Sequence, residues 1–248
     1  MRDTAQSRNG GYPTHDGGSR AARGRMDRRT LLVSMAAATA VGARPRLARA
    51  GSAIVLPGPA ANRRFSVFYK GDRIGAHTIS YSAETGQTRV TTAIDLAVKA
   101  LFLTVFAFRH RSEEVWRGGR LMSLSGETQE HGQTISVTGT ATPEGFRVVT
   151  GAGPFLAASS ALTSNSLWTQ AVLAEATVID AQHGGVIGVS AHRVGSEQIV
   201  LAGRPVRTTR FHFITPYLAG SIWYDDSGLW VRGEFERDAA SIEYQLDA

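Results

Sequence analysis

Residues 88–98 read TRVTTAIDLAV, and this stretch indicates the class of fold. Its apolar side chains, among them Val90, Ile94 and Leu96, recur at every second position, with polar side chains such as Asp95 between them. A period of two places alternate side chains on opposite faces of an extended strand. The stretch therefore predicts a long β-strand with one buried face.

Similar alternating stretches continue on both sides of this strand. They are separated by turn sequences such as Lys70-Gly71-Asp72 and Pro143-Glu144-Gly145. Turns of this kind recur about every ten positions, which is the spacing of strands in antiparallel sheets, sandwiches and barrels. Asp225-Asp226-Ser227-Gly228 predicts a tight hairpin between two strands that each carry a tryptophan.

One segment has helical character. Ser164 and Asn165 offer side chains that cap helices, and Trp168 and Val172 follow at helical spacing, so we expect one short helix from Ser166 to Ala174. The predicted fold is all-β and mainly antiparallel. It is a strongly curved meander sheet or a part-closed barrel with one short helix.

Composition excludes several classes of protein. The 248 residues include no cysteine, which excludes a disulfide scaffold, a thiol enzyme and a cysteine-ligated metal centre. The formal charge of +6 comes from the first 50 residues, where ten arginines face three aspartates. The remaining residues are close to neutral, with 17 basic and 18 acidic side chains. Binding of nucleic acid is therefore not expected, because it needs a concentrated positive field.

The chain divides into a leader, a linker and one domain. Residues 1–25 are polar and rich in Gly and Arg, which predicts a disordered leader or an over-extended start ahead of Met26. Residues 51–62 contain two prolines and are expected to form a linker. Residues 63–248 are expected to form a single antiparallel β domain.

Residues 26–50 have the layout of an export signal. Arg28 and Arg29 precede the weakly apolar stretch Leu31–Ala43, which is well short of the roughly 20 residues that a spanning helix needs. This predicts a twin-arginine signal peptide that is cleaved after Ala50. The expected partner is the twin-arginine export machinery, and the expected location is periplasmic or secreted. The mature form is not expected to span a membrane.

The densest group of polar residues is RHRSEEVW, residues 109–116. On a strand, His110, Ser112, Glu114 and Trp116 would share one face, and Arg109, Arg111, Glu113 and Val115 the other. A functional interpretation makes the first face a polar floor of a cavity, with His110 as acid, base or hydrogen-bond donor. A structural interpretation has the strand leave the core, with cross-strand ion pairs on its solvent face.

The sequence predicts no catalytic residue, no metal site and no cofactor. His110 and Glu114 lie four positions apart, roughly 13 Å along a strand, which is too far to share a metal ion without other strands. Motifs for serine catalysis, dinucleotide binding and nucleotide triphosphates are missing from the sequence.

The tryptophans have two interpretations. Trp223 and Trp230 flank the turn at residues 225–228, so a hairpin could stack them as a cross-strand pair in the core. Alternatively, tryptophans could line an apolar pocket for a lipid-like or aromatic ligand.

Several motifs together resemble a known family. They are Gly71-x-x-Ile74-Gly75-x-His77, the run RHRSEEVWRGGRL from Arg109 to Leu121, Trp223-Tyr224-Asp225 with Gly228-x-Trp230, and Ile242-Glu243-Tyr244-x-Leu246. The pattern resembles a family of uncharacterised exported bacterial proteins with a domain of unknown function. It is also similar to periplasmic β proteins whose curved antiparallel sheets are like the lipoprotein-carrier fold. The resemblance implies a periplasmic β domain and assigns no catalytic residue.

Three functional hypotheses follow. The first is a periplasmic protein that binds a hydrophobic small molecule or a lipid-like envelope ligand. Its cavity would be lined by Trp116, Trp168 and Trp223, with His77, His110 and Glu114 at the polar end. The second is a hydrolase or isomerase that uses His110 and Glu114. The third is an envelope protein-interaction module, which a long uncharged edge strand would favour.

Overall fold

The computed structural model describes residues 54–100, 103–237 and 240–247. The predictions for residues 1–25 and 26–50, including Arg28, Arg29 and cleavage after Ala50, lie outside the described residues.

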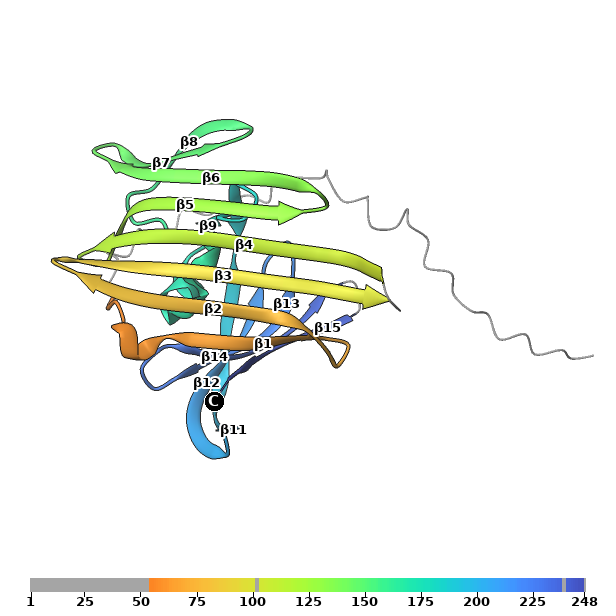
Figure 1. The fold of residues 1–248 in the computed structure, drawn as a ribbon. Coiled ribbons are helices and arrows are strands. Elements are labelled where there is room, and N and C mark those ends of the chain that lie inside the picture. The colour runs from red at the N-terminus through yellow and green to blue at the C-terminus, as the bar shows by residue number, and fades with distance from the viewer. Residues whose placement is uncertain (1–53, 101–102, 238–239, 248) are drawn as a thin grey trace, which may run out of the picture. The chain divides into compact units, whose positions relative to one another are not determined.

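The described residues form strands joined by short turns (Figure 1). The strands are β1 Arg63–Tyr69, β2 Asp72–Glu84, β3 Gln87–Ala100, β4 Leu103–Arg117, β5 Arg120–Glu130, β6 Gln133–Thr142, β7 Gly145–Thr150, β8 Gly153–Ala157, β9 Thr177–Ile179, β10 Val186–Gly188, β11 Ser190–Leu201, β12 Arg204–Ile214, β13 Ala219–Asp225, β14 Trp230–Arg237 and β15 Ala240–Leu246. Short 3₁₀ helices are η1 Pro59–Ala61, η2 Ser164–Trp168 and η3 Gln170–Ala174.

One antiparallel sheet of 13 strands contains all but two of these strands. Its order is β11-β12-β13-β14-β15-β1-β2-β3-β4-β5-β6-β7-β8, so β15 pairs with β1 and joins the two halves of the chain. The sheet is curved and open, and within the described residues its edge strands β8 and β11 each have one neighbour. β9 and β10 form a separate two-stranded sheet. The predicted all-β antiparallel class is confirmed.

The alternating stretch at residues 88–98 lies within β3 as expected. Val90 and Ile94 are buried, whereas Asp95 is exposed. The predicted hairpin at residues 225–228 is also present, because β13 ends at Asp225 and β14 begins at Trp230. The Asp225 carboxylate accepts hydrogen bonds from the backbone N–H groups of Ser227 and Leu229, which holds the turn.

The connection between β8 and β11, residues 158–189, covers one face of the large sheet. We call it the covering segment, and the sheet face beneath it the inner face. Its apolar side chains pack with inner-face residues in one hydrophobic core. From the segment come Leu162, Trp168, Val172, Val178 and Ile179, and from the sheet Phe65, Ile79, Trp116, Tyr224 and Trp230, among others.

The prediction of one helix from Ser166 to Ala174 was wrong in detail. The structure has two 3₁₀ helices in this region, and they are separated by Thr169. Thr169 is extended, with φ −118° and ψ 137°, because its backbone bridges to Leu229 of the sheet. This pairing interrupts helical hydrogen bonding, and the Thr169 hydroxyl then accepts from Ala171 N–H to cap the second helix.

The covering segment approaches the sheet closely at Gly126 of β5. A Cβ atom at this position would lie 2.8 Å from the backbone carbonyl oxygen of Ala181. A backbone carbonyl in a packed core moves only if the whole segment shifts. Glycine at position 126 therefore permits the contact between segment and sheet.

We predict that Gly126→Ala lowers the free energy of unfolding by about 1–3 kcal/mol, because the added methyl group overpacks the core. Urea denaturation monitored by tryptophan fluorescence measures this loss. The control is Gly188→Ala, since a Cβ there meets no atom within 4 Å. Equal stability of the two variants would contradict the prediction.

Candidate functional site

A row of residues crosses the inner face at right angles to the strands. Backbone pairing aligns His77 of β2 with Ile94 of β3, Ile94 with His110 of β4, and His110 with Thr128 of β5. His77, His110 and Thr128 are buried, so this row places three polar side chains inside the protein. It brings together two of the residues that the sequence singled out.

His110 is held by hydrogen bonds on both ring nitrogens. Its Nε2 lies 3.0 Å from the Asn165 Nδ2 amide, which is a donor, so Nε2 accepts and the ring proton is on Nδ1. Nδ1 then donates to the Thr128 hydroxyl at 2.8 Å. Asn165 Nδ2 also donates to Ser112 Oγ at 2.7 Å. Burial lowers the pKa of His110 to about 4, so the imidazole is neutral at physiological pH.

Glu114 lies further along the same face of β4 and is also buried. Its carboxylate accepts hydrogen bonds from Trp116 Nε1 at 3.0 Å and from the Thr163 hydroxyl of the covering segment. Burial raises the pKa of Glu114 to about 7, although the hydrogen bonds from Thr163 and Trp116 favour the charged form. The expected shared face of His110, Ser112, Glu114 and Trp116 is present, and it anchors the covering segment.

Trp116 and Trp168 lie together, with ring centroids 5.8 Å apart at an interplanar angle of 87°. Tyr81 packs against Trp168 at the same centroid distance of 5.8 Å. Trp168 Nε1 and the Tyr81 hydroxyl are buried without a hydrogen-bond partner among the described residues. The covering segment therefore fills the place where the sequence suggested an apolar cavity beside Trp116 and Trp168.

Trp223 lies apart from this group. Its indole N–H donates to the Glu197 carboxylate at 2.7 Å, and the guanidinium groups of Arg210 and Arg232 lie over its ring. The predicted stacking of Trp223 on Trp230 was wrong, because Trp230 pairs in register with Tyr224. The β-bulge lies in β14, where Val231 is the extra residue, and it turns Trp230 to the inner face opposite Tyr224, so both rings join the core.

The opposite face of β4 carries ion pairs, as the structural interpretation of residues 109–116 predicts. Arg109 and Arg111 both pair with Asp95 of β3, at 3.2 and 2.6 Å. Glu113 of β4 pairs with Arg89, which is also on β3. These pairs are largely exposed, and exposed ion pairs contribute little to stability.

A second cluster of titratable groups was not predicted. His183 Nε2 lies 3.1 Å from the Glu130 carboxylate, and His183 Nδ1 lies 3.4 Å from that of Asp180. The Tyr217 hydroxyl donates to the same Asp180 oxygen at 2.9 Å. Hydrogen bonding to Asp180 and Glu130 raises the pKa of His183 to about 9. Only the Asp180-x-x-His183 spacing is local in sequence, so no motif could have revealed this cluster.

The inner face is not uniformly covered. Toward the end of β3 and the start of β4 it carries five apolar side chains that lie outside the main hydrophobic core. We call this set the hairpin-end surface, and it consists of Ile94, Leu96, Val98, Phe106 and Phe108. Ile94 and Phe108 are buried, whereas Leu96, Val98 and Phe106 are half-buried. Ile94 lies in the row of His77 and His110, and this row separates the other four residues from the core.

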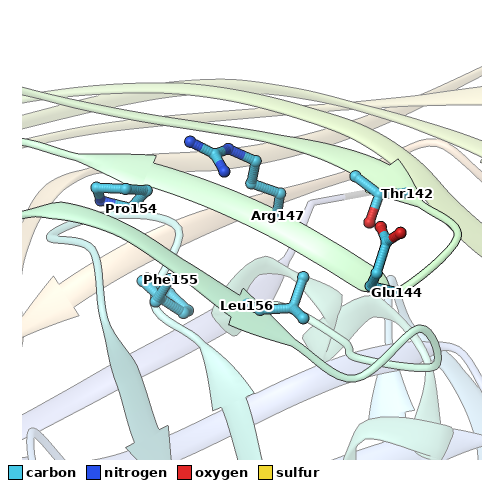
Figure 2. A pocket seen from close by; sticks show the side chains of 6 residues that line it. All are labelled: Thr142, Glu144, Arg147, Pro154, Phe155 and Leu156. Atoms are coloured by element: carbon cyan, nitrogen blue, oxygen red, sulfur yellow. The ribbon is translucent and has the colours of Figure 1, made fainter.

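Surface hollows lie elsewhere. One of about 390 Å³ is formed by side chains of β6, β7, β8 and the turn between β6 and β7 (Figure 2). Its lining residues are Thr142, Glu144, Arg147, Pro154, Phe155 and Leu156. A second, of about 240 Å³, is lined at one side by Trp116. Neither contains His77, His110 or Glu114.

Within the described ranges, no group of three His, Asp or Glu side chains is arranged to hold a metal ion. In the same ranges, no helix is long and apolar enough to cross a membrane.

We predict that Glu114→Gln stabilises the protein increasingly as pH rises from about 4.5 to 7. The unfolded carboxyl ionises at its ordinary pKa of 4.5 and the folded one at about 7, so ionisation favours unfolding in this window. The gain should reach about 2–3 kcal/mol above neutral pH. Denaturant titrations across pH measure it, with Glu113→Gln on the opposite face as control. A gain that is constant with pH would refute the assignment.

We predict that His183→Gln lowers the melting temperature most below pH 6.5. The folded pKa of about 9 lies above the ordinary 6.5, so the contribution of His183 is complete below 6.5 and lost as pH rises through 9. Thermal denaturation across pH should therefore show the wild type and variant converging at high pH. His192→Gln, outside the cluster, is the control. A difference that persists above about pH 9 would contradict the ion-pair explanation.

Comparison with known proteins places the chain in a family. No curated protein sequence is detectably similar to it. A crystal structure of a beta-barrel-like protein of domain of unknown function DUF1849 from Brucella abortus is similar in fold, with a TM-score of 0.55 and 7% identity. The match covers 75% of this chain and 94% of that one. The family model for the domain of unknown function DUF6134 matches residues 65–247. The chain therefore belongs to the DUF6134 family.

Proposed function

We propose that this chain is an exported envelope protein that binds a hydrophobic, lipid-like molecule on the hairpin-end surface. The observation that carries the proposal is the incomplete cover of the inner face. Leu96, Val98 and Phe106 face the same side as the core, yet they remain half-buried and outside it. A contiguous apolar surface that the protein leaves part-exposed is typical of a binding site.

The environment of His77 supports the proposal that the ligand is amphipathic. Its Nε2 is buried without a hydrogen-bond partner among the described residues. Burial lowers the pKa of His77 to about 3, so the ring is neutral and can donate or accept one hydrogen bond at this nitrogen. Buried polar atoms are normally paired. A hydroxyl or ester group of a ligand would supply the missing partner while its acyl part contacts Leu96 and Phe106.

The other residues proposed as ligand contacts do not all lie at the hairpin-end surface. His110 belongs to the same polar row as His77. Glu114 and Trp168 lie under the covering segment, so they would contact a ligand only after the segment moves. Trp116 lines the smaller surface hollow and is not part of the hairpin-end surface. Trp223, which packs between Arg210 and Arg232, is not part of the proposed site.

The two alternative functions have weaker support. A hydrolase or isomerase would need access to His110 and Glu114, whose side chains are sealed by the covering segment. An interaction module would need an open sheet edge. Edge strand β8 spans only Gly153–Ala157 and contains Pro154, while β11 has a β-bulge and carries Arg193 and Glu197. Short length, proline, bulges and charge all oppose strand addition.

Native mass spectrometry of the protein isolated from the cell envelope tests the proposal. We expect an extra mass that disappears on denaturation, because a lipid-like ligand is held non-covalently. N-terminal sequencing of the same sample tests export through cleavage after Ala50. If every preparation showed only the mass of the ligand-free protein, the proposal of ligand binding would be contradicted.

A displacement assay locates the site. The fluorophore N-phenyl-1-naphthylamine should bind the ligand-free wild type and be displaced by palmitate. Leu96→Ser should weaken its binding about tenfold, since a hydroxyl replaces an apolar contact. The matched control is Leu156→Ser, at an exposed leucine of β8. Equal binding by both variants would place the site elsewhere.

A further inference from the structure

The hairpin formed by β3 and β4 extends beyond its neighbours in the sheet (Figure 1). Pairing of β2 with β3 ends at Leu96, and pairing of β4 with β5 begins at Phe108. Beyond these positions, from Ala97 on β3 and before Phe108 on β4, the two strands pair only with each other among the described residues. This part of the hairpin therefore projects from the sheet without lateral support.

The projecting part is amphipathic. Leu103 and Val105 are 73% and 48% exposed. Leu103 pairs with Ala100 and therefore shares the inner face with Val98 and Phe106, whereas Val105 is the extra residue at the bulge between Val98 and Lys99. Lys99 and Thr104 pair on the opposite face, and both are exposed. An exposed apolar face with lysine on the polar face is typical of elements that lie at a bilayer surface, so a lipid bilayer suits the hairpin.

Positive charge lies beside the projecting hairpin. The chain has two lysines, Lys70 and Lys99, and both are exposed. Lys99 is on β3, and Lys70 is in the turn between β1 and β2, which the register places at the same end of the sheet. Neither lysine forms a salt bridge among the described residues, although Lys70 lies over the Tyr69 ring. Lysines next to an apolar element attract anionic lipid headgroups.

The backbone limits how deeply the hairpin can enter. Both outer edges of the projecting strands carry N–H and C=O groups that have no neighbouring strand in the part of the chain that the structure describes. Such groups are costly in hydrocarbon but tolerated among headgroups, where water remains. The geometry therefore favours shallow insertion, with apolar side chains at the boundary between headgroups and acyl chains.

We propose that the β3–β4 hairpin docks this protein on an anionic lipid bilayer, with Leu103 and Val105 inserted and Lys70 and Lys99 on the headgroups. Docking places the hairpin-end surface next to the membrane, since Val98 and Phe106 belong to both. The docking proposal rests on the proposed function in one respect only, which is that the bilayer is the source of the ligand.

Flotation of the envelope-isolated protein with vesicles tests the proposal. The wild type should bind vesicles of phosphatidylethanolamine with phosphatidylglycerol. Leu103→Asp/Val105→Asp should reduce binding about tenfold or more, because carboxylates are excluded from the acyl boundary. The matched control is Val200→Asp/Val194→Asp on β11, where the two valines are 70% and 48% exposed. This control should bind like the wild type.

Site-specific labelling keeps the proposal testable if the aspartate variant fails to fold. Because the chain has no cysteine, Leu103→Cys can carry a single nitrobenzoxadiazole fluorophore. Its emission should shift to the blue on adding the vesicles, whereas the same label at Val200→Cys should not respond. Lys70→Glu/Lys99→Glu should abolish the preference for phosphatidylglycerol over phosphatidylcholine vesicles.

Absence of vesicle binding by the wild type, or equal losses in the hairpin and β11 variants, would overturn the docking proposal and favour a protein partner. These results are distinguishable from failure of the ligand proposal. If a lipid mass co-purifies but the protein does not bind vesicles, only the docking proposal is refuted. If the protein binds vesicles but shows only the mass of the ligand-free chain, only the ligand proposal is refuted.

Discussion

A single sheet with one apolar face must be covered from water, and in this protein the covering segment meets that constraint. Without it, Trp116 on the inner face would lose its contact with Trp168, and burial of apolar surface is the main favourable term in folding. Hydrogen bonds from Asn165 to His110 and Ser112 fix the segment in one position. The electrostatics of the interior and the exposed end of the sheet both follow from where the segment lies.

Under the covering segment, burial favours the neutral forms of His110 and Glu114. Burial disfavours charge, so the pKa of His110 falls and that of Glu114 rises. Hydrogen bonds with Asn165, Thr163 and Trp116 offset part of the cost of removing these groups from water. The partnered residues thus hold the covering segment in place, whereas His77 Nε2 has no hydrogen-bond partner among the described residues. That difference is the basis for proposing a binding role for His77 and a structural role for Glu114.

Beyond the row of His77 and His110, the covering segment reaches Phe108 through the ring of His183, whereas β3 and β4 continue further. β3 and β4 have 14 and 15 residues, longer than any of their neighbours in the sheet. Their apolar alternation persists past the last contact with β2 and β5, so the same pattern that builds the core continues into exposed surface. The proposed ligand on the hairpin-end surface and the proposed bilayer contact of the hairpin both rest on this single mismatch in length.

The alternating patterns were sufficient to predict the antiparallel all-β fold and the faces of β4, because the period of two is a local property of the backbone. They could not show that Trp223 and Trp230 lie on opposite faces, since a bulge at Val231 of β14 turns Trp230 to the core beside Tyr224. Nor could they show that residues 158–189 fill the interior, or that His183 meets Glu130, which is 53 positions away. These contacts join segments that are distant in sequence, and only packing of the covering segment against the sheet brings them together.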